Sequence, residues 1–174
     1  MCAISGIFSN QTNQTHFELV KKFNIYQAHR GPDNSDIYRN NNIIFGHNRL
    51  SILDLSKNGS QPMVSNSDRF VITFNGEIYN HLKLRNQFLI NHKFRGTSDT
   101  ETLIELIEKI GLSDSLKYIE GMFAFGLWDK KEKKLFLIRD KFGEKTLFYG
   151  FYANALIFSS ELKSFEIFRN DLKI

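Results

Sequence analysis

Apolar residues in this chain fall into short segments that have the length and alternation of β-strands. Strands are predicted over residues 3–9 (AISGIFS) and 69–76 (RFVITFNG), where the second ends at a glycine. Residues 37–53 are typical of a hairpin that turns at 40–42. The last third of the chain predicts four more strands: MFAFGLWD, KLFLIRD, LFYGFY and ALIFSSE.

Between these segments, the spacing of apolar residues changes to that of helices. A helix is predicted over residues 15–29, capped by Thr15 and ending before the turn sequence RGPD, and another over about residues 78–91. A third helix begins at SDTE, where Ser98 and Glu101 have capping-box spacing. It carries one apolar stripe and ends at Gly111; the stripe consists of Leu103, Leu106, Ile107 and Ile110.

The segment MFAFGLW indicates how the strands are layered, because both of its faces are apolar. Phe123, Phe125 and Leu127 point to one side, whereas Met122, Ala124, Gly126 and Trp128 point to the other. The short connections favour antiparallel pairing, and an antiparallel sheet normally leaves one face wet. Each face here needs a cover, which two sheets packed face to face with helices outside would supply. We therefore predict an α+β fold, a four-layer α/β/β/α sandwich of two antiparallel sheets.

Length and composition fit a single domain over residues 1–174. The net charge is +4, but the basic residues are scattered, and the densest run (KKEKK) is typical of a solvated hairpin tip, so no nucleic-acid partner is predicted. The single cysteine excludes an internal disulfide, and the histidines lack metal-ligand spacing, so no metal is predicted. No signal peptide or membrane-spanning segment is recognisable, which predicts a cytoplasmic protein without a membrane partner.

The cysteine is the second residue, where removal of Met1 would make it the N-terminus. Cys2 would then carry a thiol with an ordinary pKa of about 8.5. Its α-amine, with a pKa of about 7.7 to 8, is a usable general base near neutral pH. Nucleophile and base could therefore reside on one residue. The alternative is that Cys2 is a small buried apolar residue.

Five other positions supply groups that could bind a free amino acid or stabilise its reaction. Arg49 has a guanidinium that suits a carboxylate, and Glu77 and Asp99 are acids that could hold an ammonium group. The side-chain amide of Asn75 and the adjacent backbone N–H of Gly76 could stabilise an oxyanion.

Each of these residues also has a simpler interpretation. Arg49 could form a surface salt bridge, Asn75–Gly76 could be a hairpin turn, and Asp99 could be only a helix cap. Taken together with Cys2, they predict a site in which the thiol attacks the side-chain carbonyl of a bound amino acid.

The order of motifs resembles a known family. MCAISGIF, HRGPD, GHNRLSILDLS, GSQPM, FNGEIYNH, TSDTETLIELIEKIG, GMFAFGLWD, RDKFGEK and SSELK follow one another from end to end. The chain is similar to the glutaminase domain of glutamine-hydrolysing asparagine synthetase, a class II, N-terminal-nucleophile amidotransferase. HRGPD and NGEIYN favour this branch over the glucosamine-phosphate synthase and amidophosphoribosyltransferase domains.

The resemblance implies an N-terminal-nucleophile hydrolase fold and a glutaminase site. Cys2 would form a thioester with glutamine, and Asn75 and Gly76 would form the oxyanion hole. Glutamine would be held by Arg49, Leu50, Ser51, Ile52, Leu53, Glu77 and Asp99. Residues 29–33 would form a structured turn near the site. Thr146 and Phe148 depart from the family's usual proline and tyrosine, which affects the expected conformation of that loop.

The family's synthetase domain, with its pyrophosphate loop, has no counterpart in these 174 residues. No cofactor is expected in this chain; ATP and Mg²⁺ are expected only in that domain, where ammonia would amidate aspartate. The expected partners are glutamine and a synthetase domain or subunit, in cis or in trans, with a homodimer also compatible. Two alternatives stay open: a non-catalytic glutamine-binding module, if Met1 is retained, and an amidotransferase serving another acceptor, such as a surface-polysaccharide sugar.

Overall fold

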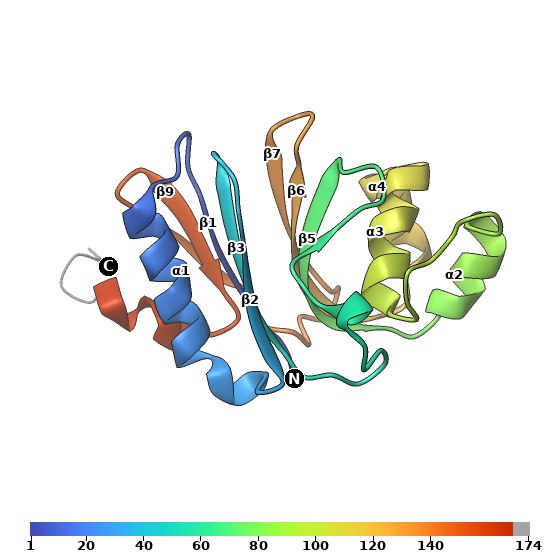
Figure 1. The fold of residues 1–174 in the computed structure, drawn as a ribbon, viewed down its shortest axis with the longest axis horizontal. Helices are drawn as coiled ribbons and strands as arrows, with labels where there is room; N and C mark the ends of the chain where they lie inside the picture. Colours follow the sequence, from blue (N-terminus) through green and yellow to red (C-terminus); the bar gives the residue numbers. More distant parts are fainter. Residues whose placement is uncertain (169–174) are drawn as a thin grey trace.

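The computed structural model describes residues 1–168 and has four layers (Figure 1). Helix α1 covers a five-stranded sheet, a four-stranded sheet packs against the other face of the first, and α3 and α2 cover the outside. Every strand pair is antiparallel. This arrangement confirms the predicted α/β/β/α sandwich.

The first sheet has the strand order β2-β3-β1-β9-β8, and the second has the order β4-β5-β6-β7. In the first sheet the strands are β1 (Ala3–Phe8), β2 (Asn34–Arg39), β3 (Ile43–Arg49), β8 (Phe148–Tyr152) and β9 (Ala155–Ser159). In the second they are β4 (Met63–Val64), β5 (Phe70–Ile78), β6 (Gly121–Asp129) and β7 (Lys134–Arg139). The hairpin that turns at residues 40–42 is β2–β3, as predicted.

The ends of two predicted helices were wrong. Helix α1 (Gln14–Tyr26) is capped by Asn13, whose side chain accepts a hydrogen bond from His16 N (2.9 Å), and not by Thr15. It ends before His29, because the chain tightens into the short 3₁₀ helix η1 (Ala28–Arg30). Helix α2 (His81–Phe88) is shorter than residues 78–91, because β5 continues past Gly76 to Ile78 in register with β6.

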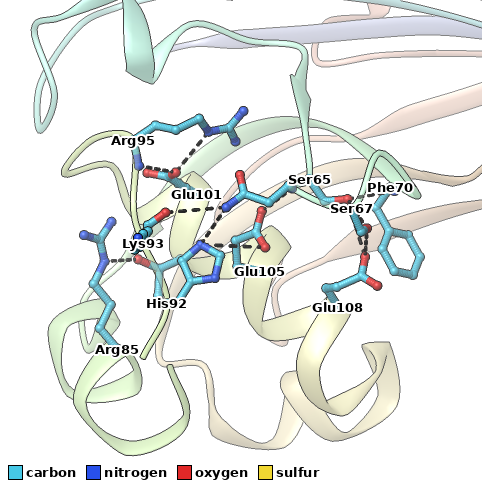
Figure 2. A network of polar contacts seen from close by, with 12 residues as sticks. Ser65, Ser67, Phe70, Arg85, His92, Lys93, Arg95, Glu101, Glu105 and Glu108 are labelled. Carbon is cyan, nitrogen blue, oxygen red and sulfur yellow. Dashed lines mark hydrogen bonds and ion pairs between the residues drawn. The ribbon is translucent and has the colours of Figure 1, made fainter. Parts of the chain in front are cut away.

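Helix α3 (Asp99–Ile110) begins as predicted, with the Ser98 hydroxyl accepting a hydrogen bond from Glu101 N (3.2 Å), and ends at Gly111. The capping box is only half formed, because the Glu101 carboxylate accepts from the backbone N–H groups of Arg95 and Gly96 instead (2.8 and 2.9 Å). Figure 2 shows Glu101 as one of three glutamates along α3, with Glu105 and Glu108, that hold the loops beside the helix. Glu101 therefore fixes the segment that leads into Asp99, whereas Glu105 and Glu108 hold the loop over residues 65–67.

Several short elements escaped prediction. They are β4, helix α4 (Leu112–Tyr118) and the 3₁₀ helices η2 (Lys57–Gly59) and η3 (Leu162–Phe168). None is long enough to display a clear apolar period, and β4 exists through its pairing with β5.

Three apolar cores hold the layers together, and β6 contributes to two of them. Phe123, Phe125 and Leu127 pack in the core under α2 and α3. Ala124 and Trp128 lie in the core between the sheets. A third core lies between the first sheet and α1. The two apolar faces predicted for this strand are thus both buried.

We expect Trp128→Ala to lower the free energy of unfolding by about 3–5 kcal/mol, because it opens a cavity between the sheets. Trp128 is only 1% exposed. Urea denaturation followed by circular dichroism measures the effect. Phe142→Ala, at a side chain 83% exposed, is the matched control and should change the free energy by less than about 0.5 kcal/mol. Equal effects of the two substitutions would contradict the assigned packing.

Among residues 1–168, none of the helices combines the length and apolar character that a bilayer span requires. The same residues contain no group of three or more His, Cys, Asp or Glu side chains arranged to hold a metal ion.

Candidate active site

The predicted site residues converge at one end of the sandwich, near the N-terminus in Figure 1. A cavity of about 100 Å³ opens there between the start of β1, the end of β3, the end of β5 and the first turn of α3. Its lining includes every predicted site residue except Ser51: Cys2, Arg49, Leu50, Ile52, Leu53, Asn75, Gly76, Glu77 and Asp99. The backbone N–H of Ser51 instead donates to Asp33 Oδ2 (2.7 Å).

The Cys2 sulfur is held by the backbone of Leu50. Sγ lies 3.4 Å from Leu50 N, which donates to it, and 3.6 Å from Leu50 O. Arg30 Nε donates to the carbonyl oxygen of Cys2 (3.1 Å), so the turn over residues 29–33 fixes the backbone at Cys2. Burial raises the pKa of the Cys2 thiol, although the Leu50 contact and the nearby positive charges oppose this. The raised pKa favours the protonated thiol over the thiolate.

Arg49 is not a surface residue. It is 8% exposed, and its guanidinium donates to the carbonyl oxygens of Ser56 (2.9 Å) and Asp54. The loop after β3 therefore wraps around Arg49 and fixes its guanidinium at the cavity wall. The interpretation of Arg49 as a surface salt bridge is wrong.

Asn75 and Gly76 lie inside β5, paired with Ala124 and Phe123 of β6, so they do not form a hairpin turn. Asn75 is 1% exposed, and its Nδ2 has no hydrogen-bond partner among residues 1–168. Burying a hydrogen-bond donor without a partner destabilises the folded protein. Such a donor is expected where the group is kept available for a ligand. A Cβ at position 76 would lie 2.3 Å from Met122 O, so pairing with β6 already requires a glycine there.

Asp99 and Glu77 bring two acids to the cavity. Asp99 Oδ2 accepts from Ile78 N and Oδ1 accepts from Thr100 N, both at 2.8 Å. Burial raises the pKa of Asp99 to about 6, and the negative charge of Glu77 adds to the increase, while these hydrogen bonds oppose it. The N-cap of α3 is Ser98 and not Asp99, so the interpretation of Asp99 as only a helix cap is wrong.

The lining residues that sequence reasoning did not place at the site include Asp54, Gln61, Thr100, Met122 and Lys145. Asp54 had a local signal, because an Asp two residues before a Ser is typical of an Asx turn, and Asp54 Oδ1 indeed accepts from Ser56 N (2.9 Å). Gln61 links Phe74 N (2.7 Å) to Thr100 Oγ1 (3.2 Å), contacts between distant segments that no local pattern reveals.

The loop that departs from the family pattern is well organised. The Asp140 carboxylate accepts from four backbone N–H groups, those of Phe123, Phe142, Glu144 and Lys145. Thr146, where the family usually has proline, donates its hydroxyl to Ser160 O (2.7 Å) and so anchors the loop to the end of β9.

The two-sheet α/β/β/α sandwich, with Cys2 directly before its first strand and at the wall of the cavity, is the N-terminal-nucleophile hydrolase fold. The same architecture occurs in a solved glutamine phosphoribosylpyrophosphate amidotransferase from Bacillus subtilis, which superposes with a TM-score of 0.78 at 20% identity and covers 95% of this chain and 43% of that one. The chain belongs to the glutamine amidotransferase domain family, which it matches over residues 1–171.

Curated relatives are similar over nearly the whole chain. Asparagine synthetase [glutamine-hydrolyzing] 2 of Bacillus subtilis is 40% identical over 94% of this chain and 22% of its own length. Amidase chry2 of Gibberella zeae is 36% identical over 94% of this chain and 24% of its own length. The chain thus spans about a quarter of these relatives, and the resemblance inferred from the motifs is confirmed.

Proposed function

We propose that this protein hydrolyses glutamine to glutamate and ammonia through a thioester on Cys2. The proposal rests on five side chains that line one cavity. They are the thiol of Cys2, the amide donor of Asn75 (unpaired within residues 1–168), the fixed guanidinium of Arg49 and the carboxyl groups of Glu77 and Asp99. These groups match the parts of glutamine: side-chain carbonyl, α-carboxylate and α-ammonium.

The reaction begins when Met1 has been removed and the α-amine belongs to Cys2. The amine accepts the thiol proton as Sγ attacks the side-chain carbonyl carbon, and the tetrahedral oxyanion is stabilised by Asn75 Nδ2 and Gly76 N–H. The amine then passes the proton to the leaving nitrogen, which departs as ammonia. Water attacks the thioester, releasing glutamate and restoring the thiol.

Glutamine is held at both ends of its backbone. Arg49 binds the α-carboxylate, Glu77 and Asp99 bind the α-ammonium, and the segment 50–53 contributes backbone contacts, among which the role of Ser51 stays a prediction. This chain needs no cofactor for the hydrolysis.

The ammonia has to reach an acceptor without being protonated in bulk water. The similarity to asparagine synthetases supports amidation of aspartate by an ATP- and Mg²⁺-dependent synthetase domain or subunit, in cis or in trans. The similarity to Amidase chry2, which is named for a different activity, supports another acceptor as the second candidate. A non-catalytic glutamine-binding role is favoured only if Met1, which lines the cavity, stays in place.

Glutamine hydrolysis by the purified chain tests the proposal. With Met1 absent by mass spectrometry, the protein should release glutamate and ammonia in equal amounts from L-glutamine. D-Glutamine, which presents its ammonium and carboxylate in the mirror arrangement, is the control and should be a poor substrate. Absence of L-glutamine hydrolysis from correctly trimmed protein would contradict the proposal.

The pH dependence of glutamine hydrolysis should show the ionisation of Asp99. Only the carboxylate form attracts an ammonium group, so protonation of Asp99 should lower kcat/KM below about pH 6, in addition to the decrease that protonation of the Cys2 α-amine causes below its pKa of about 7.7 to 8. Asp99→Asn should lower kcat/KM at neutral pH and remove the Asp99 part of this acidic limb, so that kcat/KM below about pH 6 falls about tenfold per pH unit and no longer about a hundredfold. Steady-state kinetics between pH 4.5 and 8, a range set by the pKa of about 6, measure both effects. An unchanged acidic limb in Asp99→Asn would contradict the assignment.

A further inference from the structure

We propose that Asp54 is a positioning residue that couples the two ends of the glutamine site. The inference rests on the proposed function. Arg49 and Asp99 belong to different elements, the end of β3 and the start of α3. The α-carboxylate and α-ammonium of an amino acid lie at a fixed distance from each other. A site that binds both groups therefore has to keep Arg49 and Asp99 at a matching distance.

Asp54 contacts both halves of the site. Its carbonyl oxygen accepts from Arg49 Nη2, and its carboxylate Oδ2 accepts from Thr97 N (2.8 Å), two residues before Asp99. Asp54 Oδ1 accepts hydrogen bonds from the hydroxyl (2.6 Å) and the backbone N–H (2.9 Å) of Ser56. The carbonyl oxygen of Ser56 in turn accepts a hydrogen bond from Arg49 Nη1. One buried residue thus joins the carboxylate-binding and ammonium-binding sides.

The segment over residues 95–98 is built to receive this carboxylate. A Cβ at position 96 would lie 2.3 Å from Asp54 Oδ2, so the glycine there permits the close approach. Arg85 of α2 donates to Gly96 O (3.1 Å) and Ser98 O (2.9 Å), and Glu101 holds Gly96 N from the other side. The turn is therefore rigid, and its connection to the Arg49 loop passes through Asp54.

Two further hydrogen bonds run between the same two segments. Asn58 Nδ2 donates to Arg95 O (2.7 Å), and Gln61 reaches Thr100 Oγ1. The side chains of Asn58 and Gln61 are neutral amides, and that of Asn58 is also exposed. Among these contacts, only the Asp54–Thr97 hydrogen bond involves a charged group. Burial raises the pKa of Asp54, but hydrogen bonds from Ser56 and Thr97 to the carboxylate lower it, and so does the positive charge of Arg49. The pKa of Asp54 therefore lies below its ordinary value.

The test uses Asp54→Asn, which keeps the shape and removes the charge. Loss of a buried hydrogen bond to a charged group corresponds to about a tenfold or larger effect. We expect KM for glutamine to increase by about that factor while kcat changes by less than about threefold. Glutamine affinity in the Cys2→Ala background, measured by calorimetry, should fall equally upon addition of Asp54→Asn.

Ligand preference distinguishes positioning from general stability. The wild type should prefer glutamine over its α-amide and over its analogue without the α-amine, and Asp54→Asn should reduce both preferences. Alkylation of Cys2 by iodoacetamide, which needs neither end of the zwitterion, should proceed at the wild-type rate. Asp68→Asn, at an exposed acid paired with Lys130, is the matched control and should leave all parameters unchanged.

The inference and the proposed function fail separately. If the wild type neither binds nor hydrolyses glutamine, the proposed function fails. If the wild type does both and Asp54→Asn has the same KM and preferences, Asp54 does not position the site. Should Asp54→Asn not fold, Ser56→Ala replaces it: removal of the hydroxyl donor to Oδ1 should raise KM about two- to fivefold, and an unchanged KM would overturn the inference.

Discussion

Cys2→Ala should abolish glutamine hydrolysis, lowering kcat by at least about a thousandfold, and should leave glutamine binding intact. The loss is this large because the nucleophile and its base act as a unit, and without sulfur no thioester forms. Binding should survive because, in the proposed site, Arg49, Asp99 and Glu77 make the contacts to the α-carboxylate and α-ammonium of the amino acid. Ammonia release measures the first effect, and calorimetry measures the second.

Selective alkylation is the control for this variant. Cys2 is the single cysteine of the chain, so iodoacetamide inactivation of the wild type reports on that thiol alone. Saturating glutamine should slow the inactivation. Hydrolysis by Cys2→Ala at a rate comparable to that of the wild type would exclude the thioester mechanism.

Asn75→Ala should lower kcat by about a hundredfold or more, with a smaller change in KM. Asn75 Nδ2 is buried and has no partner within residues 1–168, so it is available to the oxyanion that forms only as the thiol attacks. Donors to such oxyanions typically contribute factors of about 10² to 10³ to kcat. Steady-state kinetics provide both parameters.

The matched control is Asn91→Ala, at an exposed position that does not line the cavity. It should leave kcat within about twofold of the wild type. If Asn75→Ala raised KM and left kcat unchanged, Asn75 would contact the bound substrate and not the transition state.

Much of the fold could be predicted because its signals are local. The two apolar faces of β6 required a cover on each side, and this observation alone indicated four layers. Ser98 has both the residue type and the spacing of an N-cap, and the structure confirms it. The candidate site was predictable for a similar reason: thiol, guanidinium, carboxylates and amide were each identifiable by their chemistry.

One missed feature is a local choice between two similar caps, and the others depend on contacts between distant segments. Thr15 is a reasonable cap by residue type, but Asn13 takes the role because the chain before α1 is extended at that position. Gly76 was expected to end a strand, yet its pairing with Phe123 extends β5 to Ile78. The contacts of Asp54 with Thr97 and of Gln61 with Phe74 join segments that only the folded chain brings together.

The most direct measurement of the central claim is the mass of the N-terminal peptide after the reaction with glutamine is quenched in acid. We predict a peptide that begins at Cys2 and carries one glutamyl group on its sulfur, absent when glutamine is omitted. A protein that retains Met1 and hydrolyses glutamine at full rate, or a glutamyl group on any other residue, would contradict the mechanism.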